Sequence, residues 1–232
     1  MRPSASPGLF MRTITSLRLP LIIPALLLAL ACAAAPRPDP PMHLIYLHGR
    51  IVQDQQSRRP EHPRHGFYEL DQIAEAFRKR GFVVSAEVRP KDVTVSNAAN
   101  DVVRQVRELL RAGVPPRRIL VVGASMGAGI TLRASARLAN PDVRFAVLGP
   151  CISESAVAVF KEEQQHLSGR MLAIREESDV PSVTCPAYGA GNDSRTLQVR
   201  ELVLHTGLAH GFLYCPLPEW VEPVAEWATW TP

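Results

Sequence analysis

The chain has 232 residues, of which 46% are hydrophobic and 21% are charged. This composition is typical of a soluble globular domain, and it excludes a disordered chain, a fibrous repeat and a polytopic membrane protein. The formal net charge is +4, but three basic residues, Arg2, Arg12 and Arg18, lie in the first 31 residues, which contain no acid. Without that segment the 26 basic residues fall to 23, against 22 acidic ones, so we expect no nucleic-acid partner.

Residues 1–31 have the layout of a secretory signal peptide. Two arginines precede the uncharged apolar run Leu19–Ala31, and small residues follow it. A membrane-spanning anchor is the alternative, but the run is short for a span of about 20 residues and contains Pro20 and Pro24. We therefore expect residues 1–31 to be cleaved and the rest of the chain to be exported.

The cleavage region resembles a bacterial lipobox, in which a Cys becomes the lipidated first residue of the mature protein. Cys32 follows Leu28-Ala29-Leu30-Ala31, and the resemblance implies a lipid anchor at Cys32. Ala33 implies sorting to the outer membrane, with the protein on the periplasmic side and residues 32–41 as a Pro-rich tether. The same Ala29-Leu30-Ala31 also fits a signal-peptidase site whose product is soluble, either secreted or periplasmic.

Residues 42–232 form one predicted domain in which strands and helices alternate. In one helix Leu70, Ile73 and Phe77 recur at i, i+3 and i+7, and Gly81 ends it. Apolar strands separated by helices predict a mostly parallel sheet with helices on both faces. In chain order we expect strand His43–Leu47, helix Glu69–Arg80, strand Phe82–Val88, helix Asn97–Ala112, strand Ile119–Val122, helix Met126–Ala139, strand Phe145–Leu148, helix Ser153–Leu167, strand Met171–Ile174, strand Leu202–His205 and helix Pro218–Trp230.

The residues that follow each strand are the candidates for chemistry, because reactive sites lie beyond the carboxyl ends of parallel strands. After Ile119–Val122 comes Gly123-Ala124-Ser125-Met126-Gly127, which fits G-x-S-x-G in its strand–turn–helix setting. We expect Ser125 to be a nucleophile on a tight turn, where the two glycines avoid collisions with neighbouring backbone. The N–H of Met126, at the start of the next helix, would donate to an oxyanion.

A second oxyanion donor is predicted in His48-Gly49-Arg50, which follows the first strand. In acyl transfer this donor comes from the backbone of a loop beside the nucleophile, and we expect it to be the N–H of Arg50. Gly49 would let this loop approach the nucleophile closely. We interpret His48 as a buried, hydrogen-bonded imidazole with a structural role.

The general base is predicted to be His210, which begins an HGF sequence after the last strand. His205, inside that strand, is the competitor. The acid that orients the base would follow the strand Met171–Ile174. We favour Asp179, with Glu176 as the next alternative and Glu177 as a further one, and its role would be to fix the tautomer of the imidazole.

The segment Arg50–Gly66 contains two further groups of candidate residues. His62 and His65 could imitate a metal-binding pair, but no third ligand has a fitting spacing, so we expect no metal and no organic cofactor. The basic residues of this segment predict a solvated surface, with contact to an anionic group of a substrate as the alternative. These are Arg50, Arg58, Arg59 and Arg64.

Export also determines what the remaining cysteines can do. With Cys32 acylated, Cys151, Cys185 and Cys215 would remain in an oxidising compartment, which permits one disulfide. We favour Cys151 with Cys185, because the first follows one predicted strand and the second lies in the loop after its neighbour. Cys185 with Cys215 and three free thiols are the alternatives.

In combination these motifs resemble those of the α/β-hydrolase fold family, from Met42 to the C-terminus. The order Ser125, Asp179, His210 is nucleophile, acid, histidine, beside the HG turn and the GASMG and HGF sequences. The resemblance implies a minimal three-layer α/β sandwich with a sheet of about six strands, because the family's first two strands are missing. Many members of that family insert a cap domain before the acid-bearing strand, but Gly149–Arg170 has room for only one helix, so we expect no cap domain here.

The resemblance further implies a serine hydrolase that cleaves carboxylic esters of small, accessible substrates through a Ser125–His210–Asp179 triad and an acyl-enzyme. A thioesterase, an amidase or a peptidase on the same triad is the alternative among enzymes. A non-catalytic envelope lipoprotein that serves as a binding module is the alternative from another class.

The N-terminus of the mature protein distinguishes the two cleavage predictions. Mass spectrometry of the protein purified from membranes is expected to show a chain that begins at Cys32 and carries acyl groups, and Cys32→Ala is expected to abolish the acylation. An unmodified chain that begins at Cys32 would instead support signal-peptidase cleavage and a soluble product.

Overall fold

The computed structural model describes residues 40–150, 154–179 and 196–230. The predicted signal peptide, the lipidation site Cys32 and most of the tether lie outside the described residues, as do Cys151 and Cys185. Cys215 is described, and its thiol is exposed and free. Both predicted pairings include Cys185 and so involve a residue outside the described ones.

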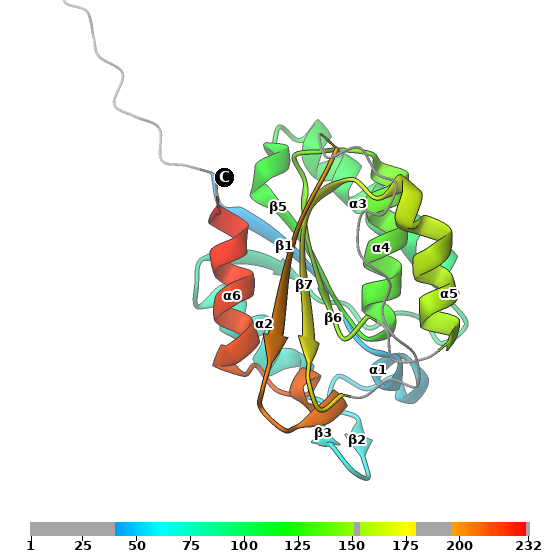
Figure 1. The fold of residues 1–232 in the computed structure, drawn as a ribbon. Helices are drawn as coiled ribbons and strands as arrows, with labels where there is room; N and C mark the ends of the chain where they lie inside the picture. The colour runs from blue at the N-terminus through cyan, green and yellow to red at the C-terminus, as the bar shows by residue number, and fades with distance from the viewer. Residues whose placement is uncertain (1–39, 151–153, 180–195, 231–232) are drawn as a thin grey trace, which may run out of the picture. The chain divides into compact units, whose positions relative to one another are not determined.

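A sheet of six parallel strands forms the centre of the structure, as the sequence predicts (Figure 1). In the order of pairing its strands are β4 (Phe82–Ser85), β1 (Met42–Leu47), β5 (Ile119–Ala124), β6 (Arg144–Leu148), β7 (Gly169–Glu176) and β8 (Leu197–Leu204). β5 and β6, in the middle, are buried along their whole length. Their uninterrupted apolar sequences follow from this double-sided burial.

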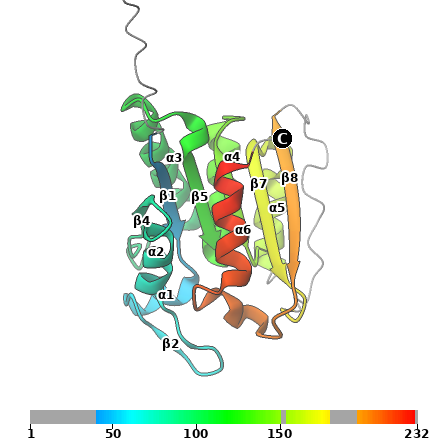
Figure 2. The same cartoon turned by 90° about the vertical axis from the view of Figure 1, so that its left-hand side faces the viewer.

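Helices cover both faces of the sheet, which makes a sandwich of three layers (Figures 1 and 2). One face is covered by α2 (Leu70–Arg78) and α6 (Pro218–Thr229), and the other by α3 (Val95–Arg111), α4 (Met126–Leu138) and α5 (Glu154–Glu163). Side chains alternate between the two cores along each strand. In β5, Leu120 and Val122 pack in the core with α2 and α6, whereas Ile119 and Val121 pack in the core with α3 and α4.

Several boundaries differ from the predicted ones, most importantly at the edge of the sheet. β7 continues to Glu176, and β8 runs over Leu197–Leu204 rather than Leu202–His205. Polar residues alternate with apolar ones in β8 because an edge strand is only partly covered. The first half of β8 was therefore not predicted, since it lacks a continuous apolar run. Glu176 therefore ends a strand rather than lying in a loop, and His205 follows its strand rather than lying inside it.

Short elements were not predicted, because they contain too few residues to show a period. The segment expected as a loop contains α1 (Arg50–Gln55) and a hairpin of β2 (Glu61–His62) and β3 (Gly66–Phe67). The predicted helix Ser153–Leu167 is divided into α5 and a short 3₁₀ turn. The 3₁₀ turns are η1 (Pro116–Arg118), η2 (Gln164–His166) and η3 (Ala209–Leu213).

Between β6 and β7 the described residues form only α5 and η2, so this part of the chain contains no cap domain. None of the helices in the described ranges combines the length and the apolar sequence that a membrane crossing requires.

The turn from β5 into α4 is packed against β1 without space for an extra carbon. A methyl group at Gly127 would overlap with the carbonyl oxygen of Leu47, and one at Gly123 would overlap with the carbonyl oxygen of Gly127. Thr131 closes the same space by donating its hydroxyl to that Gly127 oxygen (3.0 Å). The two glycines of the G-x-S-x-G sequence are therefore required by backbone packing.

We expect Gly127→Ala to lower the free energy of unfolding by about 3 kcal/mol or more, because the added methyl group collides with main-chain atoms that cannot rotate away. Gly49→Ala is the matched control, since its methyl group would find only ordinary van der Waals distances; its cost should stay below about 1 kcal/mol. Urea denaturation of both variants measures the difference. Equal stabilities would contradict this account of the turn.

Candidate active site

Ser125 occupies the turn between β5 and α4 in a backbone conformation that residues with side chains rarely adopt. Its φ is 55° and its ψ is −117°, a strain of about 1–3 kcal/mol that the surrounding packing must hold. The N–H of Ser125 donates to the carbonyl oxygen of Leu148 at the end of β6 (2.9 Å). The next residue, Met126, begins α4, so its N–H has no acceptor within the helix.

The turn after β1 lies beside Ser125, as predicted. A Cβ atom at Gly49 would be 3.5 Å from the Cβ of Ser125. This is an ordinary contact distance, and the φ of Gly49 is −67°, so the close approach does not require glycine, contrary to our expectation. Arg50 follows as the first residue of α1, and its N–H is therefore also without an acceptor inside its helix.

His48 is fully buried and fixes the orientation of this turn. The N–H of Arg89 donates to its Nε2 (3.0 Å), so the ring proton is on Nδ1, which donates to the carbonyl oxygen of Gly49 (2.8 Å). That carbonyl belongs to the same peptide group as the N–H of Arg50, so the imidazole holds the predicted oxyanion donor in place. Burial and the nearby Arg89 guanidinium lower the pKa of His48 to about 3, which keeps the ring neutral.

Arg89 is a buried cation behind the same turn, with a role that no sequence motif indicates. Its guanidinium donates to the carbonyl oxygen of His48 (2.6 Å) and to the side-chain oxygen of Gln53 (3.0 Å). Within the described residues no carboxylate forms an ion pair with it. Burial lowers its pKa to about 10, so Arg89 remains charged near neutral pH and places a positive charge next to the turn.

His210 and Asp179 meet at the same end of the sheet as Ser125, although they are 31 positions apart in sequence. Asp179 follows β7 and His210 lies in η3 after β8. The Nδ1–H of His210 donates to Oδ2 of Asp179 at 2.7 Å, and both side chains are mostly shielded from solvent. This bond directs Nε2 of the ring away from Asp179.

The competing residues have other partners. Nδ1 of His205 lies 2.7 Å from Oε2 of Glu177, and both side chains are about two-thirds exposed. Glu176 is 2% exposed and accepts hydrogen bonds from Ser178 and Thr206. Burial by itself would raise the pKa of Glu176, but the hydrogen bonds from Thr206 and Ser178 outweigh it and lower the pKa to about 2.

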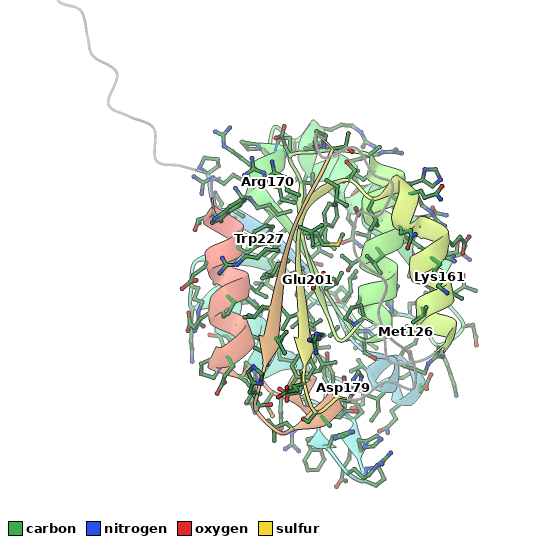
Figure 3. All side chains as sticks on the ribbon, in the orientation of Figure 1. Met126, Lys161, Arg170, Asp179, Glu201 and Trp227 are labelled. Atoms are coloured by element: carbon green, nitrogen blue, oxygen red, sulfur yellow. The ribbon has the colours of Figure 1, made fainter. Side chains whose placement is uncertain are left out.

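A cavity of about 620 Å³ joins these groups at the carboxyl end of the strands. Its lining includes Ser125, His210 and the two residues expected to supply oxyanion donors, Met126 and Arg50. Figure 3 shows Met126 and Asp179 at this end, with Arg170 at the opposite end of the sheet. The rest of the lining is mainly apolar and aromatic, and it was not predicted because it comes from separate elements. It includes Ile51, Tyr68, Val95, Leu213 and Tyr214.

Two arginines of the segment Arg50–Gly66 form ion pairs beside the cavity. Arg58 pairs with Asp71 (2.7 Å), and Arg59 pairs with Glu69 (2.8 Å), so both are engaged at the start of α2. Of the arginines in the segment, the cavity lining includes only Arg50. The predicted contact with an anionic substrate group stays a prediction, and of these residues the structure places Arg50 at the cavity.

His62 and His65 stack on each other, with ring centroids 4.6 Å apart, and His62 lines the cavity. In the described ranges no cluster of three metal-ligating side chains is present. His62 therefore forms part of the cavity wall, and His65 stacks on it.

Comparison with solved structures identifies the fold. A dienelactone hydrolase from Anabaena variabilis aligns with a TM-score of 0.50 at 18% identity, over 81% of this chain and 85% of that one. Est1E from Butyrivibrio proteoclasticus, in a structure with ferulic acid bound, aligns with a TM-score of 0.51 at 14% identity, over 82% and 89% of the two chains. No protein-family model and no curated protein matches the sequence.

The chain thus has the α/β-hydrolase fold, with a parallel six-stranded sheet and no cap domain in its described part. At these identities the likeness concerns the fold alone.

His48 should make stability depend on pH. Its pKa is lower in the folded protein than the ordinary 6.5, so below about pH 6.5 the unfolded chain binds a proton that the folded chain does not. The free energy of unfolding should therefore fall as the pH falls from about 6.5 to about 5, by up to about 1.4 kcal/mol per pH unit.

Denaturant titrations across this range test the effect against His48→Gln, whose amide offers a donor and an acceptor but does not titrate. The variant should show a shallower dependence. The range lies above the window of Glu176, whose lowered pKa acts only below its ordinary 4.5. Identical slopes for the two proteins would contradict a neutral, buried His48.

Proposed function

We propose that this protein is a serine hydrolase that cleaves carboxylic esters of small, accessible substrates through Ser125, His210 and Asp179. One observation carries the proposal. A serine on a strained strand-to-helix turn shares a cavity with a histidine whose Nδ1 is bonded to a carboxylate at 2.7 Å. This combination of nucleophile, base and orienting acid is what acyl transfer requires, and each residue follows a strand of the sheet.

In the proposed reaction the Oγ of Ser125 attacks the carbonyl carbon of the ester while its proton moves to Nε2 of His210. The tetrahedral intermediate collapses as the bond to the leaving oxygen breaks, and the departing alcohol takes that proton. Water then attacks the acyl-enzyme with His210 again as the base, which releases the carboxylic acid and regenerates Ser125. Asp179 holds the imidazole in the required tautomer and stabilises its protonated form.

The oxyanion formed in both steps would accept hydrogen bonds from the N–H groups of Met126 and Arg50. Each such donor typically lowers the barrier by about 3 kcal/mol. His48 supports the second donor through the carbonyl oxygen of Gly49. The positive charge of Arg89 behind the turn favours the same negative charge. These steps require no metal and no organic cofactor.

The cavity favours substrates of modest size. Its volume of about 620 Å³ is within the usual range for small-molecule sites, and its aromatic and apolar lining suits an acyl or alkyl group. The two structural neighbours support an ester-type substrate, since one is a dienelactone hydrolase and the other was solved with ferulic acid bound. Thioesters and amides remain chemical alternatives, because the oxyanion chemistry is common to all three.

We propose that the protein acts on the periplasmic side of the bacterial envelope, anchored by lipid on Cys32. The supporting observations are the signal-like residues 1–31 and the lipobox-like residues before Cys32. The near-neutral charge of the rest of the chain suits a partner that is a small ester rather than a nucleic acid.

Hydrolysis of short p-nitrophenyl esters should depend on Ser125 and His210 but not on His205. We expect Ser125→Ala and His210→Gln each to lower kcat by about 10⁴-fold or more, because each removes a member of the same catalytic unit. His205→Gln is the matched control from the same loop, since His205 is exposed and pairs with Glu177, and it should retain wild-type kcat.

Circular dichroism shows whether each variant is folded. Full activity of a folded Ser125→Ala protein would contradict the proposed nucleophile. The wild-type protein should also be assayed with a panel of esters, thioesters and amides. If it hydrolyses none of them, the non-catalytic binding module would be favoured instead.

A further inference from the structure

Glu176, the last residue of β7, is a buried carboxylate whose hydrogen-bond partners within the described residues are all neutral groups. Its side chain is almost completely shielded from solvent. Burying an ionised carboxylate is costly unless hydrogen bonds replace the water that it loses. What these bonds connect therefore indicates what the carboxylate does.

The carboxylate of Glu176 accepts hydrogen bonds from two different loops. Oε2 accepts from the backbone N–H of Thr206 (3.0 Å) and from its hydroxyl (2.8 Å), and Oε1 accepts from the N–H of Gly207 (3.2 Å). Both residues lie in the loop that leads to His210. Oε1 also accepts from the hydroxyl (2.9 Å) and the N–H (3.3 Å) of Ser178, which directly precedes Asp179.

Ser178 extends this connection to the residue beside His210. Its hydroxyl donates to Glu176 and accepts from the N–H of Ala209 (3.0 Å). Ala209 has a φ of 47°, a left-handed conformation that a residue with a side chain adopts only when its surroundings hold it there. The chain therefore enters His210 under strain, held by a hydroxyl that Glu176 itself orients.

Besides these bonds and the bond of Asp179 with His210, the two loops share one further side-chain link in the described residues. It is the pair of His205 with Glu177, whose side chains are about two-thirds exposed. Exposed ion pairs contribute little to stability. Asp179 follows β7 and His210 follows β8, which is the edge strand of the described sheet and pairs there with β7. Direct backbone links between these loops are limited among the described residues to the bond from Glu177 N–H to Leu204 O (2.9 Å). A shift of one loop by a fraction of an ångström would weaken the bond between Asp179 and His210, because hydrogen bonds depend steeply on distance and angle.

We propose that Glu176 is the positioning residue of this site, a buried carboxylate that joins the loop of Asp179 to the loop of His210 and so maintains their hydrogen bond. The proposal rests on the proposed function, in which that bond orients the general base. Glu176 does not touch the reacting atoms, since both of its oxygens are occupied by Ser178, Thr206 and Gly207. Bonds to a charged acceptor are about twice as strong as neutral ones, which explains why a glutamate suits this position.

The lowered pKa of Glu176 is consistent with this role. Burial would raise it, but the hydrogen bonds from Thr206 and Ser178 bring it down to about 2. Because the pKa in the folded protein is below the ordinary 4.5, the stabilising contribution is complete above that value and is lost only as the pH falls towards 2. The connection should therefore be intact wherever the enzyme is assayed.

The test compares Glu176→Gln with Glu177→Gln, its neighbour in sequence, which is exposed and pairs with His205. The amide that Glu176→Gln introduces would direct its own N–H groups at some of the present donors and lose those bonds. We expect Glu176→Gln to lower kcat for p-nitrophenyl esters by about 10²-fold with KM changed less than about twofold. Glu177→Gln should leave both constants unchanged.

A readout without catalysis is the proton NMR resonance of the hydrogen-bonded Nδ1–H of His210, assigned by its absence in His210→Gln. It should be present in the wild type and in Glu177→Gln, and lost or strongly shifted in Glu176→Gln at temperatures well below unfolding. A purely structural role would lower the melting temperature of Glu176→Gln but leave kcat and this resonance unchanged, which would overturn the proposal.

The two proposals can fail separately. If wild-type protein hydrolyses none of the esters, thioesters or amides, the proposed function fails, and the resonance alone decides whether Glu176 positions the pair. If Glu176→Gln does not fold, Ser178→Ala and Thr206→Val replace it, since each removes one hydroxyl donor. A lower kcat at unchanged KM in both would support the connection, and wild-type kcat in both would overturn it.

Discussion

The backbone at Ser125 has a positive φ in a turn whose flanking glycines are packed tightly against neighbouring main chain, and the rest of the site depends on this constraint. Gly123 and Gly127 bring β5 and α4 into contact with each other and with the end of β1. In the turn between them Ser125 has a φ of 55°. Its side chain is thereby placed beyond the end of the sheet, with the free N–H groups of α4 next to it.

Parallel pairing brings the other groups to the same place. All six strands point the same way, so the loops after β1, β5, β7 and β8 meet at one end of the sheet. Two kinds of buried polar contact then fix those loops. On one side of Ser125, His48 and Arg89 hold the turn that presents the N–H of Arg50. On the other, Glu176 holds the loops of Asp179 and His210 together.

Much of this could be predicted from the sequence where the signal is local. The apolar runs of β5 and β6 predicted a doubly covered parallel sheet, and the contiguous GASMG sequence located the strained turn. The spacing after the predicted strands favoured Asp179 over Glu176 and His210 over His205, and the hydrogen bond at 2.7 Å has the arrangement that such a pair requires. Each of these predictions rests on a short stretch of sequence around the end of one strand.

What could not be predicted depends on contacts between distant residues. Arg89 is an ordinary basic residue in the sequence, and its role follows only from its contact with His48, 41 residues away, and the burial that both share. In the sequence Glu176 resembles a catalytic acid, and its different role follows only from its contact with Thr206, 30 residues away. The hairpin of β2 and β3 was missed because two-residue strands carry no period, although it brings His62 to the cavity wall.

Covalent labelling with a fluorophosphonate tests most directly whether Ser125 is a nucleophile activated by His210. After incubation of the wild type and of His210→Gln, peptide mapping by mass spectrometry locates any phosphonyl group. We predict one adduct, on Ser125, in the wild type and a greatly slowed reaction in the variant. An adduct on another residue, or labelling of Ser125 at the same rate in both proteins, would contradict this role.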